Sequence, residues 1–390
     1  MKIAIVSDYY YPQLGGITEH VHGQATELTR RGHKVTVVTP RLVHVPRSVD
    51  GDDPPERVFD LIQIGRAWPF YVNGGETLIS LGRRIPRQLD RLFAAEAFDV
   101  VHVHNPFGLT LPFFATLRSP TATVGTLHSV VPDGYRPLRV LSREVRRVLG
   151  RLDARVAVSR AVVDSIGAFL PELDFHTIPN GIDTDFFSPE ATPIAEADEM
   201  HSILFVGRFD PRNGVKTMIH AFTRLRRERR DVRLVIVGDG PLRPVVERLV
   251  PDELRADVRF AGRVNRLRPR YLTAADILCT PCRLASFGMV LLEGMSCELP
   301  VVASRLPGFE LVMRDGIDGV LVDQIEGDAG FADALGHLLD DPEQAGDMGA
   351  AGRERVVRTF SWRVVGDQLE ALYERVLGRN RSVATIHSSA

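Results

Sequence analysis

The stretch Pro281-Cys-Arg-Leu-Ala-Ser-Phe-Gly-Met-Val-Leu-Leu-Glu-Gly-Met-Ser296 joins the end of an apolar run to a segment with helical spacing. The apolar run ends at Pro281 as a buried strand does, and Ser286 is the predicted N-cap of a helix. The buried stripe of this helix is expected to contain Phe287, Val290, Leu291 and Met295. A buried strand, a loop and a helix in this order are typical of an α/β protein.

The start of this helix is a candidate anion site. Its first turn offers backbone N–H groups at the positive end of the helix dipole, and a phosphate is the ligand that this arrangement favours. Glu293 lies about two turns further on. A carboxylate there can accept hydrogen bonds from sugar hydroxyls beside a phosphate. The alternative is an ordinary strand-to-helix turn with a solvated Glu293.

The composition sets broad limits. The chain has 390 residues, of which 44% are hydrophobic and 25% charged, with a formal net charge of −2. These values predict a globular protein of about two domains and disfavour a general nucleic-acid binder. No apolar run approaches the ~20 residues of a membrane-spanning helix, and no basic-then-apolar leader opens the chain. We therefore expect a cytoplasmic protein.

Several spacings are compatible with metal binding, but none is complete. Cys279 and Cys282 form a C-x-x-C without a second pair or a nearby histidine, so reduced thiols are expected. Asp50-Gly-Asp52 and Asp183-Thr-Asp185 have the Asp-x-Asp spacing but lie in turn-like contexts. Solvated turn or cap carboxylates are the favoured interpretation of both. We expect no metal site.

The beginning of the chain predicts a second strand–loop–helix unit. Residues 2–7 form an expected strand, a helix is expected to end at Gly32, and residues 34–39 form the next strand. Gly15 and Gly16 occupy the loop between the first strand and the helix, where glycine lets a ligand approach the backbone. Residues 42–69 are expected to be a long loop that includes one short strand.

Histidines follow two further expected strands, residues 98–104 and 122–126. His102 and His104 point the same way on a strand, but without an evident third ligand a packing role is favoured. His128 follows the end of the next strand, where a parallel sheet opens into its ligand crevice. His128 is therefore the better functional candidate.

A basic amphipathic helix is expected over residues 136–152. Its cations are Arg136, Arg139, Arg143, Arg146 and Arg147. Such a helix can lie on an anionic membrane or meet a phosphorylated acceptor. The alternative is a surface helix that packs on its own sheet.

A second strand–helix series begins at His201, after a linker over residues 186–200. Its expected strands are residues 203–207, 232–237, 257–262, 277–280, 301–304 and 319–322. Two consecutive α/β domains enclose a crevice between the carboxyl edges of their sheets, which is a usual ligand position.

The order of these motifs resembles glycosyltransferase family 4. The resemblance rests on Gly15-Gly16, Ile178-Pro-Asn-Gly-Ile-Asp183, Gly207-Arg208, Ile236-Val-Gly-Asp-Gly240, Ser286-Phe-Gly288 and Glu293. It implies an α/β protein with the GT-B fold, in which two Rossmann-like domains face each other. The expected domains are residues 1–185 and 201–360, with a helix over 361–378 that returns to the first domain and a disordered tail over 379–390. Bacterial phosphatidylinositol mannosyltransferases are the most similar members.

The resemblance also implies roles for single residues. Gly16 would lie against the donor diphosphate or the acceptor, His128 near the donor sugar, and Glu293 at the ribose. Arg208 would neutralise the leaving diphosphate, so that no cofactor and no metal is expected. The leaving phosphate would take the proton of the acceptor. The predicted catalytic residues are His128 and Arg208, and the other donor-binding residues are Gly15, Gly16, Arg212, Lys216, Ser286, Phe287, Gly288, Met289, Val290 and Glu293.

Two positions depart from the family pattern. Ala285 stands where the family usually has a Glu that contacts the donor sugar, and Asn213 stands where it usually has a Lys that pairs with the diphosphate. Arg212 or Lys216 could supply the missing charge. These departures leave open a weak, an altered or an inactive enzyme.

The sequence therefore predicts a metal-independent retaining glycosyltransferase. Its partner is expected to be a nucleotide sugar, either a GDP- or a UDP-sugar, with GDP-mannose suggested by the resemblance. The acceptor is expected to be a phosphoinositol lipid or another membrane-surface glycoconjugate at the inner face of the plasma membrane, or else a soluble molecule. The first alternative function is a non-catalytic GT-B protein that binds a nucleotide sugar or a partner. The second, a sugar-nucleotide epimerase, has only the shared architecture in its favour.

Overall fold

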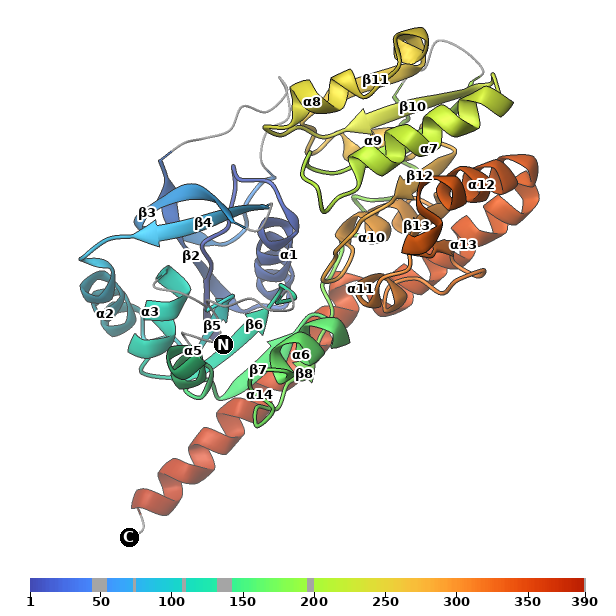
Figure 1. Cartoon of the computed structure of the whole chain (residues 1–390). Helices are drawn as coiled ribbons and strands as arrows, with labels where there is room; N and C mark the ends of the chain where they lie inside the picture. Colours follow the sequence, from blue (N-terminus) through green and yellow to red (C-terminus); the bar gives the residue numbers. More distant parts are fainter. Residues whose placement is uncertain (44–54, 73–74, 107–109, 132–141, 195–199, 389–390) are drawn as a thin grey trace.

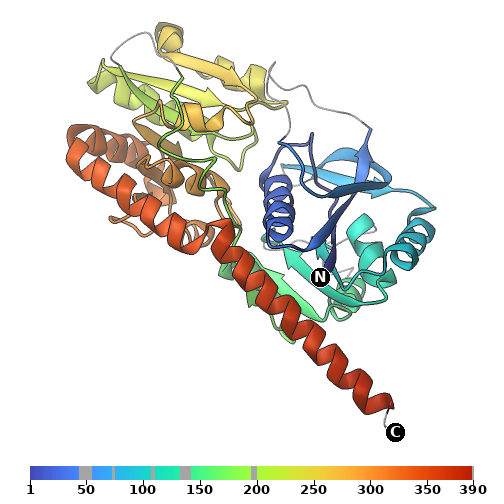
Figure 2. The same cartoon turned by 180° about the vertical axis from the view of Figure 1, so that it is seen from behind.

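The computed structural model describes residues 1–43, 55–72, 75–106, 110–131, 142–194 and 200–388. These residues form two α/β domains, and a long C-terminal helix runs back along the first domain (Figures 1 and 2). The two halves of the sequence that predicted separate strand–helix series thus form separate domains. None of the described helices is both long and apolar enough to cross a membrane.

The first domain contains one sheet, with the strand order β4-β3-β2-β1-β5-β6-β7-β8. Its strands are β1 (Lys2–Val6), β2 (Lys34–Leu42), β3 (Asp60–Val72), β4 (Gly75–Leu81), β5 (Val100–His104), β6 (Ala122–Leu127), β7 (Ala154–Ala157) and β8 (His176–Thr177). Its helices are α1 (Gly16–Arg30), α2 (Ile85–Glu96), α3 (Leu111–Arg118), α5 (Ser142–Leu149) and α6 (Arg160–Gly167). β1 pairs in parallel with β2 and β5, so the βαβ prediction for the start of the chain is confirmed.

The central strand shows why this domain has helices on both faces. Ile3 and Ile5 pack in one cluster with α1, while Ala4 and Val6 pack on the opposite face with α2 and α3. Successive side chains of a strand point to opposite faces, so a strand that is apolar throughout must be covered on both sides.

The prediction of a long loop over residues 42–69 is wrong in part. β3 begins at Asp60 and continues to Val72, and it pairs antiparallel with β4, which the sequence analysis did not predict. The one short strand expected within residues 42–69 is thus part of a longer strand, β3. Residues 44–54, which include Asp50-Gly-Asp52, lie outside the described residues.

The second domain also contains a parallel sheet, with the order β11-β10-β9-β12-β13-β14. Its strands are β9 (His201–Val206), β10 (Val232–Val237), β11 (Val258–Gly262), β12 (Ile277–Thr280), β13 (Val301–Ser304) and β14 (Val320–Val322). Its helices are α7 (Val215–Glu228), α8 (Arg243–Arg248), α9 (Arg268–Leu272), α10 (Met289–Ser296), α11 (Pro307–Glu310), α12 (Gly327–Asp340) and α13 (Pro342–Thr359), with short 3-10 helices at Asp252–Asp257 and Gln324–Glu326.

The chain crosses between the domains twice, near Ile182 and near Ser361, and the two crossing segments are hydrogen-bonded to each other. Ile182 N–H donates to the Phe360 carbonyl at 2.8 Å, and Trp362 N–H donates to the Ile182 carbonyl at 3.1 Å. Helix α14 (Trp362–Ser388) then packs on α1, where Arg31 pairs with Glu370 at 2.6 Å. The helix that returns to the first domain is therefore present, as predicted.

The end of the chain differs from the prediction. We expected a disordered tail from residue 379, whereas α14 continues to Ser388. Residues 379–388 contain neither glycine nor proline, the two residues that most disfavour a helix.

Candidate functional site

The glycine loop and the start of α10 meet between the two domains. α1 begins at Gly16 and α10 at Met289, and a Cβ atom on Gly16 would come within 3.1 Å of Met289 Cγ. Gly288, before α10, has a φ of 127°, and a Cβ there would lie 2.9 Å from the Phe309 ring. Only glycine fits that position. The first N–H groups of a helix have no partner within it, so two helix starts offer donors at one place.

Ser286 is not the N-cap that the sequence analysis predicted. Gly288 occupies the cap position of α10, and no side chain caps the helix. The Ser286 hydroxyl instead accepts a hydrogen bond from Val130 N–H at 2.9 Å, and its carbonyl accepts one from the Ser159 hydroxyl at 2.6 Å. Ser286 therefore ties the loop before α10 to the first domain. A serine hydroxyl can either cap a helix or bond to another segment, and here the contact with the first domain occupies it.

The loop after β9 brings two arginines to one carboxylate, an arrangement that we call the arginine pair. Asp210 lies 3.8 Å from the Arg208 guanidinium and 3.6 Å from that of Arg212, measured between nitrogen and oxygen. The two arginine side chains are 43% and 36% exposed, whereas that of Asp210 is 12% exposed. The predicted cations are thus partly exposed, and they share a carboxylate that is largely shielded from water.

Asn213 and Lys216 have different positions near this pair. Asn213 Nδ2 donates to the Arg208 carbonyl at 2.9 Å, so it fixes the backbone of the loop. Lys216 is exposed in the first turn of α7, whereas the ion pairs that Asp210 forms with described residues are those with Arg208 and Arg212. Arg212 is consequently the better substitute for the lysine that the family usually carries.

His128 belongs to a buried histidine cluster, which we define as His20, His102, His104 and His128. Its Nε2 lies 2.8 Å from His104 Nδ1, within hydrogen-bonding distance. Burial lowers the pKa of His128 to about 3, and it also lowers the pKa values of the other three histidines. The four rings are therefore neutral at physiological pH, and His104 and His128 are joined by a hydrogen bond.

The sequence analysis found no third partner for His102 and His104, and the structure supplies one for His104. His20, His104 and His128 each place a ring nitrogen within 4.8 Å of the other two. The 2.8 Å contact between two of these nitrogens is a hydrogen-bond length, and a metal between them would have to displace the shared proton. His102 bonds to Tyr373 Oη at 2.6 Å, as the packing interpretation predicts.

Glu293 is the most buried acidic residue of the site. Its side chain is 1% exposed, and Oε1 accepts a hydrogen bond from Arg268 Nη1 at 2.8 Å. Arg268 Nη2 also bonds to Glu19 of α1, so one guanidinium serves two carboxylates. Glu293 Oε2 is buried and has no hydrogen-bond partner among the described residues. Burial raises the pKa of Glu293 to about 8, and the charge of Arg268 opposes this rise.

We call this group, formed by Glu19, Arg268 and Glu293, the buried triad. The sequence analysis identified Glu293 and missed both partners. Glu19 and Arg268 are 249 positions apart in the chain, and no motif marks either of them. Their roles depend on the contact between the domains.

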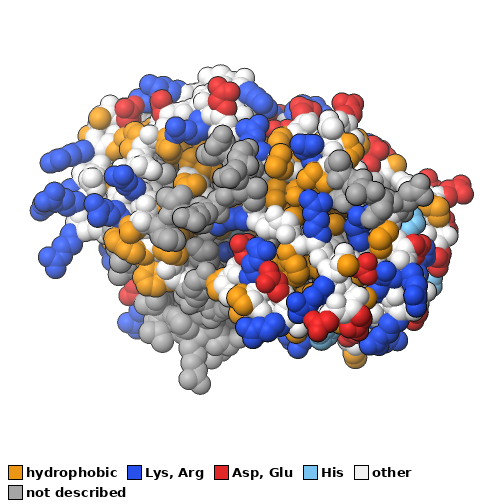
Figure 3. All heavy atoms as spheres, turned by 90° about the horizontal axis from the view of Figure 1, so that it is seen from above, with side chains coloured by type: hydrophobic (Ala, Val, Ile, Leu, Met, Phe, Trp, Pro, Cys, Tyr) orange, Lys and Arg blue, Asp and Glu red, His pale blue; other side chains and the backbone are white. Residues whose placement is uncertain are grey.

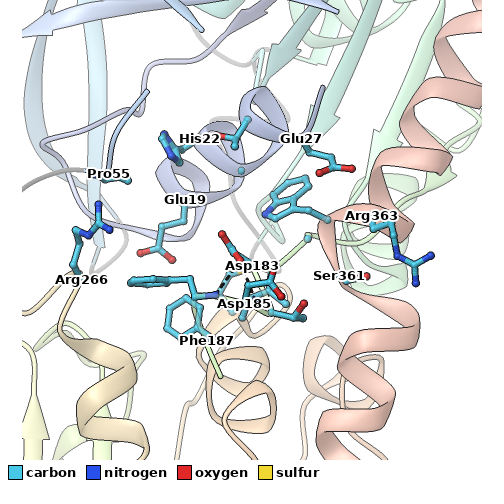
Figure 4. A pocket seen from close by; sticks show the side chains of 18 of the residues that line it. Glu19, His22, Glu27, Pro55, Asp183, Asp185, Phe187, Arg266, Ser361 and Arg363 are labelled. Carbon is cyan, nitrogen blue, oxygen red and sulfur yellow. Dashed lines mark hydrogen bonds between the residues drawn. The ribbon is translucent and has the colours of Figure 1, made fainter. Parts of the chain in front are cut away.

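A cavity of about 500 Å³ adjoins the buried triad. Side chains from α1, from the crossing at residues 183–187 and from the start of α14 surround it (Figure 4). Glu19, Asn265, Arg268 and Met289 form the part of the wall nearest to Glu293. Met289 is the single predicted donor-site residue in this wall, so the cavity extends the site beyond the predicted residues.

The remaining motifs have structural roles. Asp183 Oδ1 accepts hydrogen bonds from Asp185 N–H at 3.1 Å and Phe186 N–H at 3.0 Å, so the predicted turn carboxylate is confirmed. Cys279, Cys282 and Cys297 are buried free thiols, as predicted.

The described part of the predicted basic helix ends at Leu149, three residues before the predicted end at residue 152. α5 spans Ser142–Leu149 and buries Val145, Val148 and Leu149 in its own domain, while Arg143, Arg146 and Arg147 are exposed. Arg136 and Arg139 lie outside the described residues.

A second set of exposed cations, which we call the α2 basic surface, was missed. It consists of Arg83, Arg84, Arg87 and Arg91. Figure 3 shows Lys and Arg side chains gathered at this end of the molecule.

Comparison with known families matches both halves of the chain. The model described as Glycosyltransferase Family 4 matches residues 14–186, and the model described as Glycosyl transferases group 1 matches residues 200–341. The boundary between the two matches falls at the crossing between the domains.

The similarity to known proteins covers nearly the whole chain. The phosphatidyl-myo-inositol mannosyltransferase of Mycolicibacterium smegmatis is 31% identical, over 97% of this chain and 95% of the relative. The GDP-mannose-dependent alpha-(1-6)-phosphatidylinositol monomannoside mannosyltransferase of the same organism is 28% identical, over 94% of this chain and 97% of the relative.

Solved structures share the arrangement of the two domains. The sucrose-phosphate synthase of Thermosynechococcus elongatus superposes with a TM-score of 0.75 at 22% identity, over 97% of this chain and 99% of that one. At this identity the similarity shows the fold alone. The predicted GT-B fold is confirmed.

Proposed function

Because the chain belongs to glycosyltransferase family 4, we propose that it transfers mannose from GDP-mannose to a phosphoinositol lipid, with retained anomeric configuration and without a metal ion. The names of the two mycobacterial relatives support the choice of sugar, donor and acceptor. The two helix starts, the arginine pair and the buried triad give each part of such a donor a partner of suitable chemistry.

The observation that carries the proposal is the unpartnered Oε2 of Glu293. A buried carboxylate oxygen without a hydrogen bond costs about 1–3 kcal/mol or more. It lies in α10, the helix whose first turn can bind a phosphate, and its triad partners Glu19 and Arg268 line a cavity of about 500 Å³. A ribose attached to that phosphate brings hydroxyl donors to such an oxygen. The same residue thus distinguishes a nucleotide site from a site for inorganic phosphate.

The diphosphate is assigned to the helix starts and the arginine pair. Arg208 and Arg212 lie 3.8 and 3.6 Å from Asp210 and are both partly exposed, so a diphosphate can reach both guanidinium groups and offer them shorter, charge-assisted bonds. Asn213 keeps the Arg208 backbone in place by its bond to the carbonyl. In this arrangement Arg212 replaces the charge that Asn213 lacks.

The proposed reaction needs no residue to act as a base. The bond from the anomeric carbon to the diphosphate oxygen breaks as the acceptor oxygen bonds to the same face of the sugar. The proton of the acceptor hydroxyl passes to the leaving phosphate oxygen. Arg208, Arg212 and the helix start at Met289 stabilise the charge that develops on the diphosphate. His128, which is neutral and hydrogen-bonded, is assigned to the sugar as a hydrogen-bond partner.

The acceptor proposal rests on two exposed basic surfaces of the first domain. Arg143, Arg146 and Arg147 are exposed on α5, where Arg146 also pairs with Glu172 at 2.5 Å. The α2 basic surface lies just before and on α2, and α3 contacts both α2 and α5. Each such cation contributes about 1 kcal/mol to binding at an anionic membrane surface. A phosphoinositol lipid presents its headgroup at that surface, so these helices would bring the chain to its acceptor.

The test is the release of nucleoside diphosphate from GDP- and UDP-sugars by the purified chain, in the presence of EDTA. Each donor is assayed with and without phosphatidylinositol vesicles and with soluble inositol. Release from GDP-mannose that requires the vesicles supports the full proposal. Release that requires soluble inositol instead would exclude the lipid acceptor, and loss of release in EDTA would exclude the metal-independent mechanism.

A non-catalytic GT-B protein is the second candidate, and Ala285 and Asn213 favour it. It predicts that the folded chain binds GDP or UDP but releases no product from any donor. In that case Asn213→Lys and Ala285→Glu, singly and together, are the substitutions that would restore turnover. If the double variant also releases no product, the loss of these two groups is not what makes the chain inactive towards the donors and acceptors tested.

A further inference from the structure

Arg268 has its hydrogen-bonding directions fixed by the surrounding residues. Nε donates to the Asn265 carbonyl at 3.1 Å, Nη1 to Glu293 at 2.8 Å, and Nη2 to Glu19. The guanidinium carbon lies 5.4 Å from the centre of the Phe187 ring, within range of a cation–π contact. With three donor directions and one face engaged, this guanidinium has one orientation in the closed site.

The orientation of Arg268 determines that of Glu293. Arg268 holds Oε1 and leaves Oε2 without a partner among the described residues. A guanidinium can bind both oxygens of one carboxylate, and this bidentate pairing would be the stronger ion pair. Here the second N–H direction goes to Glu19 instead, so the geometry reserves Oε2 for a group that is not part of the triad.

Glu19 makes this arrangement depend on the position of the domains. Glu19 belongs to α1 in the first domain, whereas α9 and α10, which carry Arg268 and Glu293, belong to the second. The Glu19 and Arg268 side chains are 14% and 12% exposed, so the contact between them is largely shielded from water. Separation of the domains would remove one of the two carboxylates that hold Arg268.

We propose that Arg268 is a positioning residue, which fixes Glu293 so that its second oxygen meets the donor ribose, and that Glu19 holds Arg268 in place when the domains close. This inference rests on the proposed function, because it takes a nucleotide as the ligand. It adds a residue from the first domain to the recognition of a nucleoside bound in the second. Donor affinity is thereby linked to domain closure.

The alternative is that Arg268 and Glu293 form an ordinary structural ion pair. Nucleotides with and without the ribose hydroxyls distinguish the two explanations. The readout is the affinity of the full chain for GDP and for 2′,3′-dideoxyguanosine diphosphate, measured by calorimetry, with the corresponding uridine pair in parallel. Arg268→Met is expected to lower the affinity for the ribose nucleotide roughly tenfold, the size of one charge-assisted hydrogen bond. The affinity for the dideoxy nucleotide is expected to change less than about twofold, because it has no hydroxyl for Glu293.

Arg229→Met is the matched control. Arg229 also bonds to two carboxylates, those of Asp231 and Asp340, and its side chain is 20% exposed. It lies directly after α7 and before β10, at the edge of the sheet opposite the site. This control is expected to bind both nucleotides as the native chain does. Glu19→Gln keeps the Arg268–Glu293 bond, and we expect it to lower ribose-nucleotide affinity about threefold without affecting the dideoxy nucleotide.

A pH series separates positioning from folding. The titratable groups that face Glu293 are Arg268, Glu19, Tyr11 and Cys297. Removing the cation removes the influence that favours the ionised carboxylate. In Arg268→Met the rise of GDP affinity with pH should therefore shift to higher pH, whereas in Arg229→Met it should not.

The outcomes also distinguish this inference from the proposed function. If the native folded chain binds neither GDP nor UDP, both fail. If it binds one of them and Arg268→Met weakens the ribose and dideoxy nucleotides equally, the positioning role alone is refuted. Arg268→Lys, which keeps the charge but not the fork of donors, should recover part of the ribose preference if the full substitution impairs folding.

Discussion

The candidate site includes two ionic groups, the arginine pair and the buried triad, in which the numbers of arginines and carboxylates are reversed. In the arginine pair, two arginines share Asp210 at 3.8 and 3.6 Å, and their side chains are 43% and 36% exposed. In the buried triad, two carboxylates share Arg268, and Glu293 is 1% exposed. One group has an excess of positive charge in contact with water, and the other has an excess of acceptor oxygens in the interior.

The difference indicates what each group can bind. A partly exposed arginine pair can exchange its carboxylate partner for a diphosphate at small cost, because the two guanidinium groups are already in contact with water. A buried acceptor cannot be satisfied by water without opening the site, so it favours a ligand that brings a hydroxyl. Under the proposed function, the diphosphate would therefore meet the arginine pair and the ribose would meet the buried triad.

The largest expected effect is on the exposed group. Arg208→Ala should lower the rate of nucleoside-diphosphate release about 10²–10³-fold, because it removes a donor to the charge that develops on the leaving group. The control is Arg227→Ala on the exposed surface of α7. Comparable rates for the two variants, measured as initial release from GDP-mannose, would remove Arg208 from the mechanism.

Arg212→Ala should have the next largest effect. If Arg212 replaces the charge missing at Asn213, its loss should reduce the same initial rate about 10- to 100-fold. The same Arg227→Ala variant serves for comparison. Equal rates in these two variants would refute the replacement and leave Asn213 without a substitute.

The buried group should control how stability depends on pH. Burial raises the folded-state pKa of Glu293 to about 8, so between 4.5 and 8 the native protein binds more protons than the unfolded chain. Its contribution to stability is therefore fully present at low pH and is lost as the pH rises through about 8.

Urea unfolding from pH 5 to pH 9 tests this sign. Glu293→Gln should make the decline of unfolding free energy with pH shallower by about 1 kcal/mol per pH unit in this range. The slope is compared, rather than the absolute stability, because the substitution also removes the bond to Arg268. An unchanged slope would mean that Glu293 is not the titrating group.

The smallest expected effect again concerns the exposed group. Asp210→Asn removes the carboxylate that competes with the diphosphate, and it keeps an oxygen to accept from Arg212 N–H, at 2.9 Å in the native chain. Affinity for GDP should rise about threefold, a gain of less than 1 kcal/mol typical of an exposed pair. Calorimetry that shows weaker binding instead would indicate that Asp210 positions the arginines rather than competes with the ligand.

Local patterns were sufficient to predict most of the architecture. The apolar strands of the two sheets and the glycines before α1 are determined by neighbouring residues, and residues close in sequence carry this information. The antiparallel strand β4 was not predicted, and β3 is longer than the single short strand expected within residues 42–69. The predicted cap at Ser286 was wrong because a serine hydroxyl suits both a cap and the contact with Val130 that it makes.

The sequence by itself determined the two-domain α/β fold, the resemblance to glycosyltransferase family 4, and the placement of Arg208 and Glu293 at strand ends and helix starts. Only the tertiary structure decided which groups surround them. Glu19 lies 249 positions from Arg268, and His20 joins His104 and His128 from a different element. Such partners depend on how two domains pack, and the periodicity of a single chain segment contains no information about a contact with another domain.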